Sequence, residues 1–232
     1  MVGILVQLAV SWLIVWLLEK KNLSVLGLFP TKTRLNDFLI FFLITAFCCA
    51  SEFIMKMLFA GQYWRLNPDL SFMLILKGTW WNIKSVLFEE LIFRGVLLYI
   101  LIKRFGANKA ILVSAITFGV YHWFSYELFG NVQQMIFVFI VTGLMGLICA
   151  YGYAKSFSLY IPIAIHLGWN FTRSVIFSES AIGKQLLIQS ESSKSAIVSP
   201  LVYYCILLLP MFSALLFSFI LIKKKKQAGL SR

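Results

Sequence analysis

The chain has 232 residues, of which 60% are hydrophobic and only 13% are charged, and its mean hydropathy is +0.87. Soluble domains are roughly 45–50% apolar and about 25% charged, so this composition excludes an ordinary soluble domain and predicts an integral membrane protein. The net charge of +12 does not indicate a nucleic-acid partner, because the basic residues lie mostly at the ends of apolar runs, as topology signals do.

Seven apolar runs approach or exceed the length of a membrane-spanning helix, which needs about 20 mostly apolar residues. In chain order they cover residues 2–18, 38–59, 70–102, 110–124, 132–153, 159–177 and 201–222. The run 70–102 exceeds one bilayer, and its first part carries tryptophans and lysines typical of the interface. We therefore expect an all-α, polytopic membrane helix bundle of about eight helices, with seven or eight spans, and the length favours one membrane domain over residues 1–232.

Basic residues that follow alternate runs predict the orientation of the chain. They are Lys20, Lys21, Lys32, Arg34, Lys103, Arg104, Lys109, Lys155 and the four lysines at 223–226. Positive charge marks the cytoplasmic side, so the C-terminus is expected there, and the N-terminus outside if the run 70–102 crosses once. If its first part also spans, the N-terminus lies inside. Short loops and compact size favour a bacterial plasma membrane.

Three charged residues interrupt the long run at Glu89, Glu90 and Arg94. A bare charge in hydrocarbon is costly, so such residues are rare and usually functional. Glu90 and Arg94 are spaced i,i+4 and can form an ion pair on one face of a helix. Glu89 is rotated about 100° from Glu90 and therefore needs a different partner. A second i,i+4 pair, Glu52 and Lys56, is interpreted as a structural ion pair.

Both histidines of the chain, His122 and His166, also fall inside apolar runs. Asn170 follows His166 at i,i+4, so the two side chains share a helix face. Counted from the lysines at the inner boundary at about 1.5 Å per residue, Glu89, His122 and Asn170 reach a similar depth. Convergence of this kind is expected of an active site, and equally of a buried polar network that holds helices together.

The residue types favour hydrolysis of a carbonyl. A carboxylate beside a histidine can take a proton from water, and a His–Asn pair can donate hydrogen bonds to a developing oxyanion. This chemistry requires no cofactor. No serine or cysteine shows the spacing of an activated nucleophile, although Ser114 and Ser174 remain alternatives.

Three motifs resemble those of one family: EELIFR resembles EExxxR, FGVYH resembles FxxxH, and HLGWN resembles HxxxN. In this order within a polytopic chain, they are similar to the type II CAAX prenyl endopeptidase and bacteriocin-processing family, also called the CPBP or Abi family, whose eukaryotic branch is Rce1-like. The resemblance covers a core at about residues 80–174.

The resemblance implies a metal-independent intramembrane glutamate-type peptidase with eight helices around a polar cavity. It implies that Glu89 and His122 activate water, that Glu90 and Arg94 support Glu89, and that His166 and Asn170 line an oxyanion hole. The implied partners are membrane lipids and a membrane-associated peptide or protein substrate, as in CAAX-like processing, pheromone or bacteriocin maturation, or bacteriocin immunity.

Two other functions stay open. A membrane scaffold or regulator could retain the fold without proteolysis. A zinc metalloprotease could use the two glutamates and two histidines as ligands, but the HExxH motif is absent and Arg94 beside the carboxylates would repel a cation.

Overall fold

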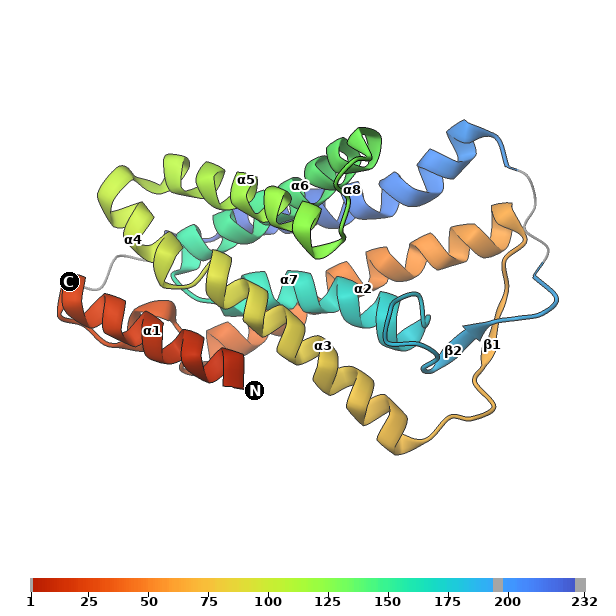
Figure 1. Ribbon diagram of the computed structural model, residues 1–232, viewed down its shortest axis with the longest axis horizontal. Helices are drawn as coiled ribbons and strands as arrows, with labels where there is room; N and C mark the ends of the chain where they lie inside the picture. Colours follow the sequence, from red (N-terminus) through yellow and green to blue (C-terminus); the bar gives the residue numbers. More distant parts are fainter. Residues whose placement is uncertain (1, 194–197, 228–232) are drawn as a thin grey trace. The chain divides into compact units, whose positions relative to one another are not determined.

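The structure is a computed structural model that describes residues 2–193 and 198–227. The described residues form eight α-helices, with a short two-stranded sheet (Figure 1). The helices are α1 (Val2–Glu19), α2 (Lys32–Ala60), α3 (Phe72–Phe93), α4 (Val96–Phe105), α5 (Ala107–Ser125), α6 (Val132–Ser156), α7 (Tyr160–Phe171) and α8 (Pro200–Lys224). The predicted all-α class and the helix number are confirmed.

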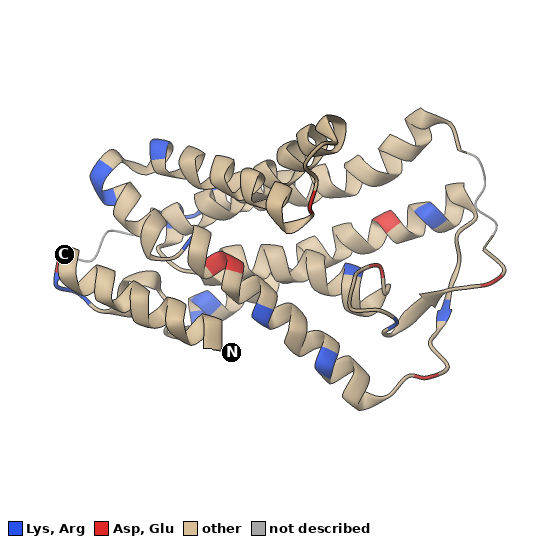
Figure 2. Cartoon of the chain, viewed as in Figure 1, with Lys and Arg blue, Asp and Glu red and all other residues tan. Residues whose placement is uncertain are grey.

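Among the described helices, four are long and apolar enough to cross a membrane: α1, α2, α6 and α8. Most of the residues in the helices are neither acidic nor basic (Figure 2). Large side chains such as Phe47 and Leu58 on α2 are 72% and 71% exposed, as expected of a surface in contact with lipid. The chain is a membrane protein, while the predicted seven or eight spans stay a prediction. α3 has 22 residues but carries four charges, and α7 has only 12 residues.

The run 70–102 is not one continuous helix, because it breaks at Arg94 and Gly95 between α3 and α4. The Arg94 N–H still donates to the Glu90 carbonyl oxygen, at 2.8 Å. At Gly95 a side chain would collide with the carbonyl oxygen of Leu91, so the break requires a residue without a Cβ. The expectation that both glutamates and Arg94 share one helix is therefore corrected: Arg94 follows the last residue of α3.

The chain divides into two compact units, and each is described by itself. Unit 1 comprises Met1–Phe38, Val86–Ala164 and Phe219–Arg232, and unit 2 comprises Leu39–Ser85 and Ile165–Ser218. The single domain predicted for residues 1–232 stays a prediction.

The core of unit 1 gathers side chains of α1, α4 and α6 around the 3-10 helix Leu23–Leu26 (η1). Leu26, Tyr153 and Leu159 are fully buried there. The Tyr153 hydroxyl donates to the Val25 carbonyl oxygen at 3.3 Å. Gly27 has a φ of 64° and lies against the backbone of residues 157 and 158, so the turn after η1 needs a glycine. These contacts close the loop between α1 and α2 onto α6.

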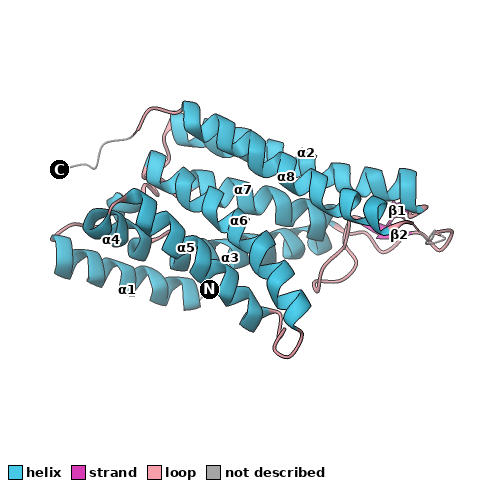
Figure 3. Cartoon of the chain, turned by 90° about the horizontal axis from the view of Figure 1, so that it is seen from above, coloured by secondary structure: helices cyan, strands magenta, loops and turns pink. Residues whose placement is uncertain are grey.

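Unit 2 contains the two strands, β1 (Trp64–Leu66) and β2 (Leu187–Gln189), which pair antiparallel with Trp64 opposite Gln189 (Figure 3). From the sequence we predicted no strands, because three residues are too few to show an alternating pattern of apolar and polar residues. The two strands join the loop after α2 to the loop before α8. Trp64 contacts Phe53 of α2 and Phe177, and these two phenylalanine rings stack at 3.9 Å.

Also within unit 2, the C-terminal half of α7 packs closely on α2 at Gly168. A Cβ at this position would lie 2.5 Å from the Phe42 carbonyl oxygen and would also meet the Thr45 hydroxyl. Thr45 is fully buried, and its hydroxyl donates to the Phe41 carbonyl oxygen at 2.9 Å. Small residues allow membrane helices to approach in this way, where packing rather than the hydrophobic effect holds them together.

We predict that Gly168→Ala lowers the free energy of unfolding by about 1–3 kcal/mol, because α7 must move away from the α2 backbone. Thermal unfolding of the full chain in detergent measures the effect. Gly143→Ala on α6 is the matched control, since a Cβ there meets only the Ala115 carbonyl oxygen at an ordinary 3.7 Å. Equal melting temperatures for the two variants would contradict the close packing at Gly168.

Candidate functional site

The carboxylate of Glu89 and the imidazole of His122 lie together within unit 1. Glu89 Oε2 is 4.0 Å from His122 Nε2, and their side chains are 15% and 7% exposed. Glu89 is one turn before the end of α3, and His122 is one turn before the end of α5. The predicted juxtaposition of a partly buried acid and a histidine from separate helices is therefore present.

The imidazole of His122 is held by the residue one turn before it. His122 Nδ1 lies 2.8 Å from the Phe118 carbonyl oxygen, and this contact assigns the ring proton to Nδ1. In the neutral imidazole Nε2, the nitrogen nearer Glu89, is then an acceptor. Rings of Phe118, Tyr121 and Tyr126 pack edge-on around the imidazole, with centroid separations of 4.6, 5.3 and 5.2 Å. The orientation of His122 is thus fixed by α5 itself and by its aromatic neighbours.

Glu90 and Arg94 form the predicted ion pair, and both are fully buried. Arg94 Nη1 donates to Glu90 Oε1 at 3.1 Å. The guanidinium lies over the Phe118 ring, with its central carbon 4.0 Å from the ring centroid, an arrangement that favours a cation when water is excluded. Removing one member of such a pair is costly, because the other charge is left buried without compensation.

Gly146 of α6 makes room for the guanidinium. A Cβ at this position would lie 3.0 Å from Arg94 Nη2 and 3.1 Å from the Phe118 ring. From the sequence we did not predict this role. No sequence signal reveals it, because Gly146 and Arg94 are 52 positions apart. Phe118 was also missed as a site residue, although its i,i+4 spacing from His122 indicated contact with the imidazole.

His166 and Asn170 belong to unit 2, where they lie one turn apart on α7 with Gly168 between them. His166 is 6% exposed, and Asn170 is partly buried. The structure thus brings together Glu89, Glu90, Arg94 and His122 in one unit and places the HLGWN segment against α2 in the other. That Glu89, His122 and Asn170 lie at a similar depth in the membrane stays a prediction.

The two serines left open as nucleophiles are both buried. The Ser114 hydroxyl donates to the Phe93 carbonyl oxygen at 2.9 Å, where it satisfies the end of α3. This bond gives Ser114 a structural explanation at the helix break. Ser174 lies in the π-helix Thr172–Ile176 (η2) that follows α7.

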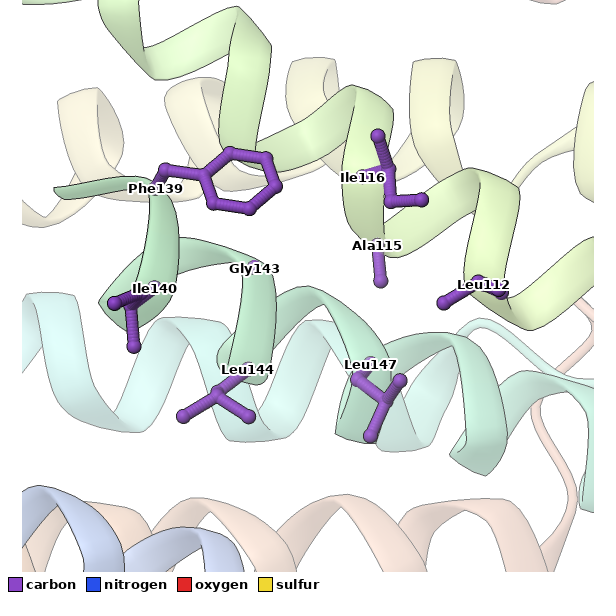
Figure 4. A pocket seen from close by; sticks show the side chains of 8 residues that line it. All are labelled: Leu112, Ala115, Ile116, Phe139, Ile140, Gly143, Leu144 and Leu147. Atoms are coloured by element: carbon purple, nitrogen blue, oxygen red, sulfur yellow. The ribbon is translucent and has the colours of Figure 1, made fainter. Parts of the chain in front are cut away.

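Metal ligands and a cavity are the remaining elements of a candidate site. In neither unit do three described His, Cys, Asp or Glu side chains gather as a metal site would require. A cavity of about 230 Å³ lies between α5 and α6, and Figure 4 shows its lining. The lining residues are Leu112, Ala115, Ile116, Phe139, Ile140, Gly143, Leu144 and Leu147. All are apolar, so this cavity is not the polar cavity that we expected around the motifs. The polar cavity stays a prediction.

A comparison with known protein families finds a match in the region of the chain that contains the three motifs. The family described as Rce1-like, type II CAAX prenyl endopeptidase Rce1-like, matches residues 71–172, which extend from just before α3 to the start of η2. This match contains all three motifs and confirms the resemblance to the CAAX/Abi membrane peptidases. Neither a search of curated proteins nor a search of solved structures found a match.

We predict that Gly146→Ala perturbs the Glu90–Arg94 pair and lowers the free energy of unfolding by about 1–3 kcal/mol, because the guanidinium and Phe118 must both move. Thermal unfolding of the purified protein, compared with Gly143→Ala three residues earlier on the same helix, measures the loss. A variant at position 146 as stable as the one at position 143 would argue against this role for Gly146.

Proposed function

We propose that the chain is an intramembrane endopeptidase, because residues 71–172 match the family described as type II CAAX prenyl endopeptidase Rce1-like. In this proposal Glu89 and His122 activate water to hydrolyse a peptide bond, without a covalent intermediate or a metal. The substrate class is a membrane-associated peptide or protein.

One observation carries the proposal: Glu89 Oε2 and His122 Nε2 lie 4.0 Å apart. With a neutral imidazole whose proton is on Nδ1, both atoms are hydrogen-bond acceptors. A water molecule about 2.8 Å from each atom can donate one hydrogen bond to each. Its oxygen lone pairs then point away from both acceptors and are available to attack a carbonyl carbon. The contact between His122 Nδ1 and the Phe118 carbonyl oxygen supports this arrangement, because it leaves Nε2 as the acceptor.

The reaction follows from these positions. Glu89 takes a proton from the water as its oxygen forms a bond to the carbonyl carbon, and the carbonyl oxygen becomes an oxyanion. The proton passes from Glu89 to the leaving amide nitrogen as the C–N bond breaks. The products are a carboxylic acid and an amine, and Glu89 returns to the carboxylate form. His122 accepts the other hydrogen bond of the water and thereby orients it for attack.

The other motif residues have supporting roles in this proposal. Glu90 and Arg94 hold the end of α3, so that the carboxylate of Glu89 keeps its direction. His166 and Asn170 supply hydrogen-bond donors to the oxyanion, a contribution worth about 2.7–4 kcal/mol per donor in other hydrolases. Their i,i+4 spacing on α7 supports this assignment because both side chains share one face.

The biological setting is part of the same proposal. Four apolar helices support a multi-pass membrane protein, and the lysines in the last turn of α8 favour a cytoplasmic side for that end of the helix. A bacterial plasma membrane is the proposed location because the loops are short and the chain is compact. Membrane lipids surround it, and no cofactor or nucleic acid takes part. The processing of CAAX-like proteins, the maturation of peptide pheromones or bacteriocins, and immunity to bacteriocins are the candidate reactions.

We predict that Glu89→Gln lowers kcat by at least about a hundredfold, because an amide cannot take the proton from water. The measurement uses the full chain in phospholipid vesicles and quenched fluorogenic peptides that end in a CaaX sequence, with and without a farnesyl group. Glu19→Gln is the matched control, since Glu19 pairs with Lys103 at the opposite end of α4 and away from His122. Full cleavage by Glu89→Gln would contradict the role of Glu89 as the base, and a lack of cleavage by the unchanged chain would favour the scaffold function.

We further predict that cleavage is unchanged after prolonged dialysis against a strong zinc chelator, because Glu89, not a metal ion, activates the water. Metal analysis of the dialysed protein accompanies the rate measurement. Loss of activity that returns when Zn²⁺ is added would favour the metalloprotease over the proposed mechanism.

A further inference from the structure

A cluster of four charged residues in unit 2 has no part in the proposed reaction. Glu52 of α2 is fully buried, and Arg173 Nη1 donates to its Oε2 at 2.9 Å. Lys56 Nζ lies 2.9 Å from Glu52 Oε1, which confirms the pair predicted from the i,i+4 spacing. Both cations also bind Glu179, at 2.8 Å from Lys56 and 3.0 Å from Arg173. The pair that we expected to be local to α2 is therefore a link between α2 and the segment after α7.

Arg173 occupies a particular place in the chain, one turn after Asn170 and within η2. η2 is a π-helix, and its Phe177 N–H donates to the Thr172 carbonyl oxygen at 3.1 Å. π-helices are rare and are frequently found at functional sites. The contact that holds this π-helix is the ion pair with Glu52, so a buried charge on α2 fixes the turn that directly follows Asn170.

Three further contacts bind the same segment to α2 along its length. Gly168 lies against the α2 backbone at Phe42. The ring of Phe171 lies 6.0 Å from that of Phe42, and the ring of Phe177 stacks on Phe53 at 3.9 Å. Asn170 thus lies, along the chain, between two residues that contact α2: Gly168 before it and Arg173 after it. Of these contacts, the ion pair is the one that is directional.

We propose that Glu52, through Arg173, is a positioning residue for Asn170. The ion pair sets the rotation and tilt of the C-terminal turn of α7, and with it the direction of the Asn170 amide. This inference rests on the proposed function, in which Asn170 donates to the oxyanion. A displacement of about 1 Å in a positioned group can cost about a hundredfold in rate, so a residue that never touches the substrate can control kcat.

The first test measures order and does not depend on activity. Amide hydrogen exchange of residues 166–177 is compared in the full chain and in Glu52→Gln, and we expect the exchange rate to rise by about threefold or more, since the turn loses its anchor. Asp37→Asn is the matched control, because Asp37 is a buried carboxylate on the same helix that pairs with Lys225 at 2.6 Å. Unchanged exchange in Glu52→Gln, or an equal rise in Asp37→Asn, would overturn the proposal.

The second test is kinetic and uses the same vesicles and peptides. Glu52→Gln should lower kcat by about ten- to a hundredfold with little change in KM, because an oxyanion donor acts in the transition state. In an Asn170→Ala background the same substitution should change kcat by less than about twofold, since residues that act as a unit are not additive. An undiminished loss in that background means that Glu52 acts on stability alone.

The two tests separate the two proposals. If Glu89→Gln cleaves normally, the proposed function fails, while the exchange result still decides whether Glu52 orders the segment after His166. If Glu52→Gln does not accumulate in the membrane, Arg173→Lys replaces it. A lysine keeps the charge but cannot bridge Glu52 and Glu179 as the guanidinium does, so we expect a smaller rise in exchange and a smaller loss of kcat.

Discussion

A buried charge is stable in an apolar surrounding only beside an opposite charge, and the Glu90–Arg94 pair is the clearest case in this protein. Both residues are fully buried, and the guanidinium is enclosed by the Phe118 ring and the surface of α6 at Gly146. The end of α3 is therefore fixed to α5 and α6. The position of Glu89, which lies next to Glu90, depends on this pair.

The adjacent residues Glu89 and Glu90 have different environments because successive side chains of a helix point about 100° apart. Glu90 faces Arg94 and is closed to solvent, whereas Glu89 is partly exposed and faces His122. α3 ends at Phe93, one residue before Arg94, and α4 begins as a separate helix after Gly95. Two carboxylates that lie close together can take different roles in this way, because their environments differ.

Unit 2 also contains a buried glutamate that pairs with an arginine. Glu52 is as deeply buried as Glu90, and its guanidinium partner, Arg173, comes from a distant part of the chain. In each unit, a fully buried carboxylate meets an arginine beside a motif residue. Arginine suits this task because it is always charged and its planar group can bind more than one acceptor.

The amino-acid sequence alone determined the all-α membrane class, the approximate bounds of most helices, and the ion pairs at i,i+4 spacing. These depend on local periodicity and on the cost of a charge in lipid, and both can be read along the chain. The break at Gly95, the strands at residues 64–66 and 187–189, the contact of Gly146 with Arg94 and the link from Glu52 to Arg173 were decided only by the tertiary structure. These features depend on contacts between residues distant in sequence or, at Gly95, on crowding of the backbone. Neither cause produces a periodic pattern in the amino-acid sequence.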